Sequence, residues 1–169
     1  MAKVIYISGG QRSGKSSFAQ RTAEGLSDNP IYLATAKCWD EEFKQRIERH
    51  QSDRGDNWRT LEEPMAISTH ELSGSVVLMD CVTLWLTNIF MEFDMDAARS
   101  LAWAKEEWMR FTAQDFTLIV VSNEIGMGVV AIEPSTRAFV DMQGWMNQFI
   151  AQGADQAYAM ISGLPLKLK

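Results

Sequence analysis

The stretch Gly9-Gly10-Gln11-Arg12-Ser13-Gly14-Lys15-Ser16 decides how this chain is expected to fold. It matches G-x-x-x-x-G-K-[ST], the pattern of a phosphate-binding loop. Residues 3–8 before it are short, apolar and β-branched, which predicts a buried strand. Residues 16–26 after it carry apolar side chains at helical spacing. Strand, glycine loop and helix follow in the order that the motif requires, so we favour a nucleotide site over a glycine-rich turn that binds nothing.

Each part of this loop has a predicted role in binding a nucleoside triphosphate. Its glycines let backbone N–H groups turn inward around phosphate oxygens, and the helix N-terminus adds partial positive charge. Lys15 should reach the β- and γ-phosphates, and the Ser16 hydroxyl should hold Mg²⁺. The predicted nucleotide contacts are therefore all the residues of the loop: Gly9, Gly10, Gln11, Arg12, Ser13, Gly14, Lys15 and Ser16.

Composition and charge narrow the class of protein. The 169 residues suit one domain, and 46% hydrophobic residues are enough for a sizeable core. A net charge of −6 and a pI of about 4.9 argue against a general nucleic-acid binder, which would carry a basic face. We expect neither a transmembrane segment nor a signal peptide, because no apolar run approaches a membrane span and a strand begins at once. Cys38 and Cys81 are too few for a disulfide scaffold and indicate buried thiols in a reducing cytoplasm.

Apolar strands alternate with helical segments along the rest of the chain. This pattern predicts a P-loop NTPase-like α/β fold, with a mostly parallel central sheet and helices on both faces, in one domain spanning residues 1–169. The remaining expected strands are residues 31–36, 58–62, 76–80, 116–122, 156–161 and, at an edge, 165–169. The remaining expected helices are residues 40–50, 64–72, 83–91, 96–112 and a last one, capped by Ser135 or Thr136, that runs to about residue 152.

Asp80 is the second predicted metal ligand, after Ser16. It ends the apolar strand at residues 76–80. In phosphate-loop enzymes an acid at this place holds Mg²⁺ directly or through water, and ligands gather at the carboxyl ends of parallel strands. We favour that role over the alternative, in which Asp80 is only the N-cap of the following helix.

Two other features stay open on the residues alone. His50 ends a charged helical segment, where a histidine is more often a favourable contact with the helix dipole than a catalytic group. The other histidine, His70, has no neighbour that recommends it. Residues 123–128, Asn-Glu-Ile-Gly-Met-Gly, follow a strand at its carboxyl end and fit either a substrate loop or a flexible connection.

The chain resembles a known family, the bifunctional adenosylcobinamide kinase / adenosylcobinamide-phosphate guanylyltransferases of cobalamin biosynthesis. The resemblance runs in order from residue 4 to the end of the chain. The segment 123–128 and the stretch around His50 are specific to that family, whereas the phosphate loop is not. The other matching positions are residues 32–36, Arg46, Ile47, Arg54, residues 58–60, Glu62, residues 78–85, Asn88, Val121, Ser122, Arg137, Phe139, Asp141, Gly144, Asn147, Gln148, Ala154 and Asp155.

The resemblance implies two reactions. ATP or GTP phosphorylates the aminopropanol hydroxyl of adenosylcobinamide, and GTP then donates GMP to adenosylcobinamide phosphate, giving adenosyl-GDP-cobinamide and pyrophosphate. His50 would carry the GMP covalently, and neutral imidazole suits that role. A homotrimer is also implied, and the aromatic-rich segments around Trp85, Trp103 and Trp108 favour such an assembly. We expect the corrinoid to bind near its subunit boundaries. Beyond the loop and Asp80, the implied GTP contacts are Ala34, Thr35, Ala36, Gln51, Ser52, Asp53, Arg54 and Glu62.

The match to this family has two departures. Val-Ala at residues 130–131 replaces the usual Val-Pro, and residues 92–114 match weakly, so corrinoid contacts are unassigned there. Two alternatives remain on the sequence: a P-loop small-molecule kinase in which His50 is idle, and a nucleotide-controlled binding protein that transfers no group.

Overall fold

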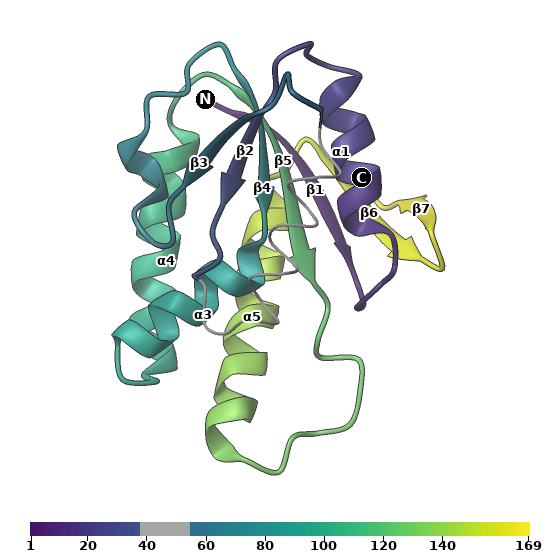
Figure 1. The fold of residues 1–169 in the computed structure, drawn as a ribbon. Helices are drawn as coiled ribbons and strands as arrows, with labels where there is room; N and C mark the ends of the chain where they lie inside the picture. The colour runs from purple at the N-terminus through teal and green to yellow at the C-terminus, as the bar shows by residue number, and fades with distance from the viewer. Residues whose placement is uncertain (38–54) are drawn as a thin grey trace.

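The computed structural model of the protein describes residues 1–37 and 55–169, and in this part of the chain one sheet carries the fold (Figure 1). The sheet has seven strands in the order β3-β2-β4-β5-β1-β6-β7, and neighbouring strands are parallel except for β6 and β7. The strands are β1 (Lys3–Gly9), β2 (Ile31–Ala34), β3 (Arg59–Glu62), β4 (Val76–Asp80), β5 (Thr117–Asn123), β6 (Gln156–Ile161) and β7 (Leu164–Lys167). The described helices are α1 (Lys15–Glu24), α3 (Val82–Glu92), α4 (Ala97–Thr112), α5 (Pro134–Gly153) and the short 3₁₀ helix η1 (Ile67–Thr69).

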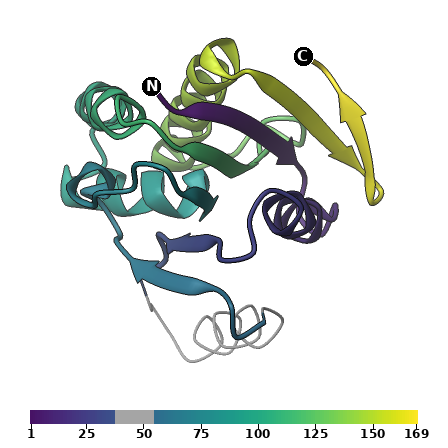
Figure 2. The ribbon, with the colours of Figure 1, turned by 90° about the horizontal axis from the view of Figure 1, so that it is seen from above.

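Helices cover both faces of this sheet, as the sequence predicts. Figure 2 shows α1 on one face and α3, α4 and α5 on the other. The alternation of side chains along each strand explains the two layers. Val4 and Tyr6 of β1 belong to the larger apolar cluster with α3, α4 and α5, whereas Ile5 and Ile7 pack with α1. The central strands are apolar on both sides, which is why they appear in the sequence as continuous apolar runs.

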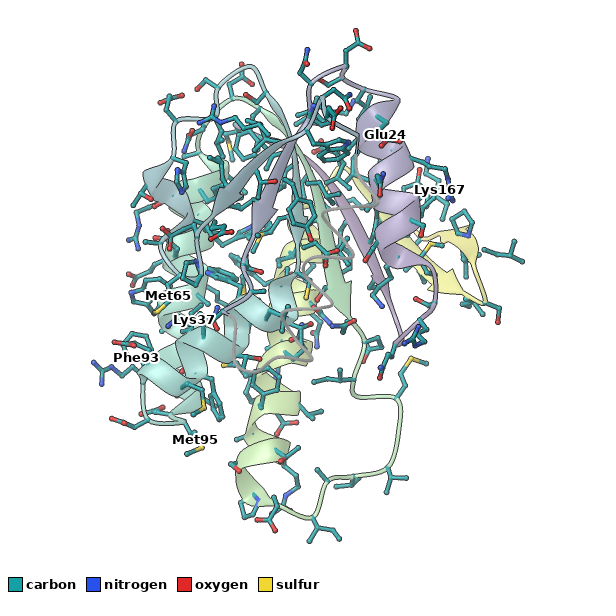
Figure 3. All side chains as sticks on the ribbon, in the orientation of Figure 1. Glu24, Lys37, Met65, Phe93, Met95 and Lys167 are labelled. Atoms are coloured by element: carbon teal, nitrogen blue, oxygen red, sulfur yellow. The ribbon has the colours of Figure 1, made fainter. Side chains whose placement is uncertain are left out.

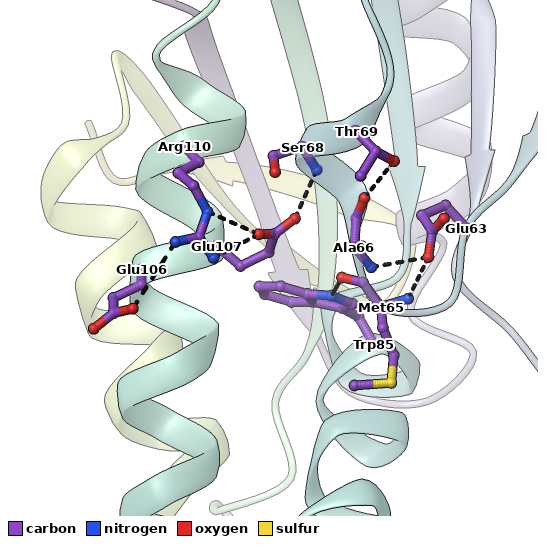
Figure 4. A network of polar contacts seen from close by, with 9 residues as sticks. All are labelled: Glu63, Met65, Ala66, Ser68, Thr69, Trp85, Glu106, Glu107 and Arg110. Carbon is purple, nitrogen blue, oxygen red and sulfur yellow. Dashed lines mark hydrogen bonds and ion pairs between the residues drawn. The ribbon is translucent and has the colours of Figure 1, made fainter.

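The core under α3 and α4 is built around Trp85. Its side chain is fully buried, and its indole N–H donates to the Met65 carbonyl oxygen at 2.8 Å. The buried Glu107 carboxylate accepts hydrogen bonds from the Ser68 backbone N–H at 2.7 Å and the Arg110 guanidinium at 2.9 Å (Figure 4). These bonds join the segment of residues 65–68 to α3 and α4, and they pair the buried carboxylate. Trp85 and Trp108 are thus core residues of the single chain, and the homotrimer stays a prediction.

The helix predicted for residues 64–72 is wrong, because only the single turn η1 forms there. The Glu63 carboxylate accepts hydrogen bonds from the backbone N–H groups of Met65 and Ala66, at 2.9 and 2.8 Å, and closes a local turn. The chain is extended again at His70. Side-chain bonds to the nearby backbone compete here with a regular helix.

The start of the last helix also differs from the prediction. Helix α5 begins at Pro134 with Glu133 as its N-cap, so neither Ser135 nor Thr136 caps it. Proline suits the first helical position because its missing N–H has no partner to lose there. The edge strand expected at residues 165–169 is confirmed as β7, and the helix expected at 40–50 lies outside the described residues. Within the described ranges, no helix has both the length and the apolar character that crossing a membrane requires.

Candidate nucleotide site

The phosphate loop joins the carboxyl end of β1 to the first turn of α1. Gly14 is the N-cap of α1 with φ of +91°, and no side chain of the described residues caps the helix. A Cβ on Gly9 would lie 2.7 Å from Ser13 Oγ and 2.8 Å from the Met160 carbonyl oxygen, so only glycine fits that place. Ser13 Oγ is buried and has no hydrogen-bond partner among the described residues. An uncapped helix start beside an unsatisfied hydroxyl suits an anion such as phosphate.

Lys15 lies inside this loop rather than on the surface. Its side chain is 7% exposed, and its ammonium donates to the Gly10 carbonyl oxygen at 2.5 Å. Burial lowers the pKa of Lys15 below its usual value, and the nearby Cys81 and Asp80 oppose that shift. Among the described residues the hydrogen-bond partner of Lys15 is the neutral Gly10 carbonyl, which a buried cation is favourably placed to exchange for phosphate oxygens.

Ser16 and Asp80 form the predicted metal-binding pair. Ser16 Oγ donates to Asp80 Oδ2 at 2.9 Å, although the strands β1 and β4 that lead to these residues are separated by β5. A hydroxyl and a carboxylate side by side fit Mg²⁺, which takes one or two protein oxygens and completes its shell with water and phosphate. Among the described residues no group of three or more His, Cys, Asp or Glu side chains could form a cage for another metal. The alternative role of Asp80 is not seen, since Cys81 is the N-cap of α3.

Ala34 and Glu62 lie at the same edge of the sheet as Asp80. In the strand register Ala34 is opposite both Glu62 of β3 and Asp80 of β4. The Glu62 side chain is exposed. The carboxyl ends of β2, β3 and β4 therefore extend the edge on which the phosphate loop lies, and this edge is where parallel sheets bind ligands.

Thr35 is at this edge, but its side chain is fully buried. Its hydroxyl donates to the Cys81 carbonyl oxygen at 2.8 Å and accepts from the Cys81 N–H at 3.0 Å. The Asn88 amide donates to the Thr35 carbonyl oxygen at 2.7 Å. The Thr35 side chain therefore holds the ends of β2 and β4 together, and its chain neighbours Ala34 and Ala36 are half-buried.

Other predicted site residues cannot be placed in this way. His50 and the residues after it, Gln51, Ser52, Asp53 and Arg54, lie outside the described residues, as does Cys38. The described Cys81 is buried as predicted, and burial raises the pKa of its thiol to about 12.

The structure adds a buried polar cluster that the sequence prediction missed. Ser122 Oγ donates to Asn147 Oδ1 at 2.6 Å, and the Gln143 amide donates to both, at 2.9 and 3.0 Å. Burial raises the pKa of the neighbouring Tyr6 to about 12, although a hydrogen bond with Ser122 opposes this shift. Gln143 and Asn147 are four residues apart on α5, and each directly follows a buried methionine, Met142 or Met146. Two amides on an apolar helix face were the signal in the sequence.

Comparisons with known proteins cover almost the whole chain. A family model described as "Cobinamide kinase / cobinamide phosphate guanyltransferase" matches residues 5–168. The chain is 38% identical over 168 residues to the "Bifunctional adenosylcobalamin biosynthesis protein CobP" of Pseudomonas aeruginosa, covering 96% of this chain and 95% of that protein. It is 32% identical over 181 residues to the "Bifunctional adenosylcobalamin biosynthesis protein CobU" of Escherichia coli, covering 98% and 99%. Among solved structures, the flagellar accessory protein FlaH of Methanocaldococcus jannaschii has a TM-score of 0.46 at 14% identity, covering 99% of this chain and 78% of FlaH.

Proposed function

The chain belongs to the cobinamide kinase / cobinamide phosphate guanyltransferase family, and from this premise we propose how one nucleotide site serves both reactions. In the first reaction ATP or GTP phosphorylates the hydroxyl group of adenosylcobinamide. In the second, GTP gives GMP to adenosylcobinamide phosphate and pyrophosphate leaves. Residues 1–169 act as one catalytic domain in this proposal, and they work in the cytoplasm, where both nucleotides are available.

The observation that carries this proposal is the convergence of Lys15, Ser16 and Asp80 at the uncapped start of α1. Phosphoryl transfer depends on positioning and charge neutralisation more than on covalent help. Lys15 exchanges the Gly10 carbonyl for the β- and γ-phosphates, and the N–H groups of residues 9–16 surround the phosphate oxygens. Ala34, Ala36 and Glu62 then lie along the same edge, where the rest of the nucleotide is bound.

Ser16 and Asp80 are the residues that would hold Mg²⁺. Their oxygens are already 2.9 Å apart and belong to the donor types that Mg²⁺ prefers. When bound, Mg²⁺ neutralises charge on the phosphates during transfer. Within the protein, the task of Asp80 is to orient the Ser16 hydroxyl, and the task of α1 is to carry that hydroxyl to the phosphates.

The guanylyl transfer is proposed to pass through His50. A neutral imidazole nitrogen attacks the α-phosphorus of GTP, a P–N bond forms, and the bond to the bridging oxygen breaks as pyrophosphate leaves. A phosphate oxygen of adenosylcobinamide phosphate then attacks the same phosphorus, the P–N bond breaks and imidazole is released. Gln51, Ser52, Asp53 and Arg54 follow His50 in the sequence and are proposed to contact the GTP.

Incubation with α-labelled GTP tests this proposal. Wild-type protein should retain the label after denaturation, and mild acid should release it while base should not, as expected of a P–N bond. His50→Ala should lose the label but keep triphosphate binding. His70→Gln is the matched control, because the chain has only two histidines, and it should label like the wild type. Label that persists in His50→Ala, or wild-type label that survives acid, would contradict the role of His50.

A further inference from the structure

Asn123 occupies a central place at the edge that carries the nucleotide site. It is the last residue of β5, the strand between β1, which leads to the phosphate loop, and β4, which ends at Asp80 (Figure 1). In the register it is paired with Gly9, the first residue of the loop. Its neighbour Val121 on the same strand is paired with Asp80. Asn123 therefore lies between the phosphate loop and Asp80, the predicted metal ligand.

The backbone of Asn123 is held from three sides. Its N–H donates to Thr83 Oγ1 in the first turn of α3 at 3.1 Å. Its carbonyl oxygen accepts from the Asn147 amide of α5 at 3.2 Å. The next N–H, of Glu124, donates to the Gly9 carbonyl oxygen at 3.0 Å. None of these bonds uses the Asn123 side chain, so the backbone is fixed independently of it.

Asn147 is itself held by the buried polar cluster with Ser122 and Gln143. Apolar side chains of the same size would stabilise this part of the core more than the buried polar groups do. The cluster has a second role, which the contacts that it makes indicate. Its only bond to the ligand-binding edge is the one from Asn147 to the Asn123 carbonyl oxygen, among the contacts of the described residues. The cluster thus serves to keep the end of β5 in one position.

The Asn123 side chain, in contrast, has only a weak partner. Within the described part of the chain, the hydrogen-bond contact of its amide is Nδ2 to Cys81 Sγ at 3.9 Å. A neutral thiol is a poor acceptor. Cys81 directly follows Asp80 in the chain, so this contact lies next to the predicted metal ligand. The half-buried amide of Asn123 therefore offers an N–H donor at the strand end that lies between Gly9 of the phosphate loop and Asp80.

We propose that the Asn123 carboxamide donates a hydrogen bond to the γ-phosphoryl group during the kinase reaction, and that Asn123 is a catalytic residue of this step. The inference rests on the kinase reaction proposed above. In that step the acceptor hydroxyl oxygen bonds to the γ-phosphorus, the bond to the β–γ bridging oxygen breaks, the nucleoside diphosphate leaves and the hydroxyl proton passes to water. A fixed donor facing the transferring group stabilises the charge that the equatorial oxygens carry in the transition state.

The test compares Asn123→Ala and Asn123→Asp with the wild type. Both variants keep the backbone bonds to Thr83, Asn147 and Gly9, so the fold should hold. Loss of one donor of this type costs about 10²–10³ in kcat at other enzymes. We expect kcat for adenosylcobinamide phosphorylation to fall by at least about 30-fold in Asn123→Ala, and further in Asn123→Asp, whose added negative charge faces the phosphates. Asn29→Ala, an exposed asparagine in the turn before β2 at the opposite edge, is the matched control.

Binding and stability measurements separate this role from a structural one. Affinity for GDP should stay within about threefold of wild type and the melting temperature should stay unchanged in Asn123→Ala, since GDP lacks the γ-phosphoryl group and the backbone bonds remain. A kcat within threefold of wild type would overturn the inference, and so would equal losses of GDP affinity, kcat and melting temperature. If wild-type protein fails to phosphorylate adenosylcobinamide at all, the proposed function fails instead, so the two failures are distinguishable.

Discussion

At Lys15, two requirements of the site oppose each other. The ammonium must be charged to bind phosphates, yet its burial disfavours the charge and lowers its pKa. The unfolded chain exposes this lysine and has the ordinary pKa. Below both pKa values Lys15 is charged in both states, so the folded protein bears the full desolvation cost. As the pH rises through the lowered folded pKa toward the unfolded value, that cost is relieved.

This opposition predicts that Lys15→Met stabilises the fold while it removes function. The substitution keeps the apolar stem and removes the buried charge, so the free energy of unfolding should rise at neutral pH. The gain over wild type should shrink as the pH is raised toward 10.5, the ordinary lysine value. Urea unfolding of both proteins between neutral pH and pH 10.5 measures the difference in unfolding free energy. GTP binding should be weaker in the variant at every pH. A variant less stable than wild type at neutral pH would contradict this account of Lys15.

Gly14 shows why a residue of the loop cannot be exchanged. Its φ of +91° disfavours any side chain, and an added Cβ would lie 3.2 Å from Gly163 Cα in the turn between β6 and β7. We expect Gly14→Ala to lose about 1–2 kcal/mol of unfolding free energy and to weaken nucleotide binding. Gly144→Ala in α5 is the matched control: apart from its chain neighbours and the nearby backbone of its own helix, its added methyl group meets no atom of the described residues within 4 Å, and it should gain about 0.5–1 kcal/mol. Thermal unfolding of both variants measures these changes in stability. Equal changes in Gly14→Ala and Gly144→Ala would contradict the prediction.

At the scale of single residues, the sequence predicted the site residues that a short local pattern identifies. The loop pattern located Lys15 and Ser16, and the end of an apolar strand located Asp80. The sequence did not predict the two hydrogen bonds between the Thr35 hydroxyl and the Cys81 backbone. Thr35 and Cys81 are far apart in the chain and meet only because their strands pair. Asn123 was seen only as part of a loop, since its place between β1 and β4 depends on the strand order.

At the scale of elements, α5 links the core to the nucleotide edge. Its buried Gln143 and Asn147 join β5 through Ser122 and the Asn123 carbonyl oxygen. Strand and helix identities followed from apolar periodicity and were largely confirmed. The short η1 and the start of α5 were not predicted. The Glu63 carboxylate closes a turn before η1, and Pro134 takes the first position of α5.

The cluster on α5 predicts that alanine substitutions of the neighbouring Asn147 and Gln148 lower the free energy of unfolding by different amounts. Asn147→Ala leaves the buried Ser122 hydroxyl and the Gln143 amide without a shared acceptor, which costs about 1–3 kcal/mol for each polar group left unpaired. Gln148→Ala changes an exposed neighbour on the same helix and should stay within about 0.5 kcal/mol of wild type. Urea denaturation gives both values. Equal midpoints for the two variants would show that the cluster does not hold β5.

At the scale of the whole molecule, several large apolar side chains are exposed in the loop between β5 and α5. Met127 is 88% exposed and Val129 is 99% exposed in the loop between β5 and α5, and Val130 and Ile132 are exposed beside them. Met95, which Figure 3 labels at the turn between α3 and α4, lines a groove of about 190 Å³ together with Thr87, Phe90, Ser135, Thr136 and Phe139. Exposed apolar side chains of this kind support the proposal of a homotrimer better than the buried Trp85 and Trp108 do.

The trimer proposal predicts a mass of about 57 kDa, three times 19.1 kDa, in sedimentation at micromolar concentration. Ile132→Asp should shift the protein toward the monomer, because the charge would be buried at a subunit contact. Leu26→Asp, at an exposed position after α1, is the control and should sediment like wild type. A wild-type protein that sediments only as a monomer would remove the proposal.

The central claim is that one phosphate loop serves two reactions that separate at His50. Turnover of adenosylcobinamide with GTP, with the products followed by mass spectrometry, tests it most directly. Wild-type protein should form adenosylcobinamide phosphate and then adenosyl-GDP-cobinamide, whereas His50→Ala should stop at the phosphate. Formation of adenosyl-GDP-cobinamide by His50→Ala, or of neither product by the wild type, would contradict the claim.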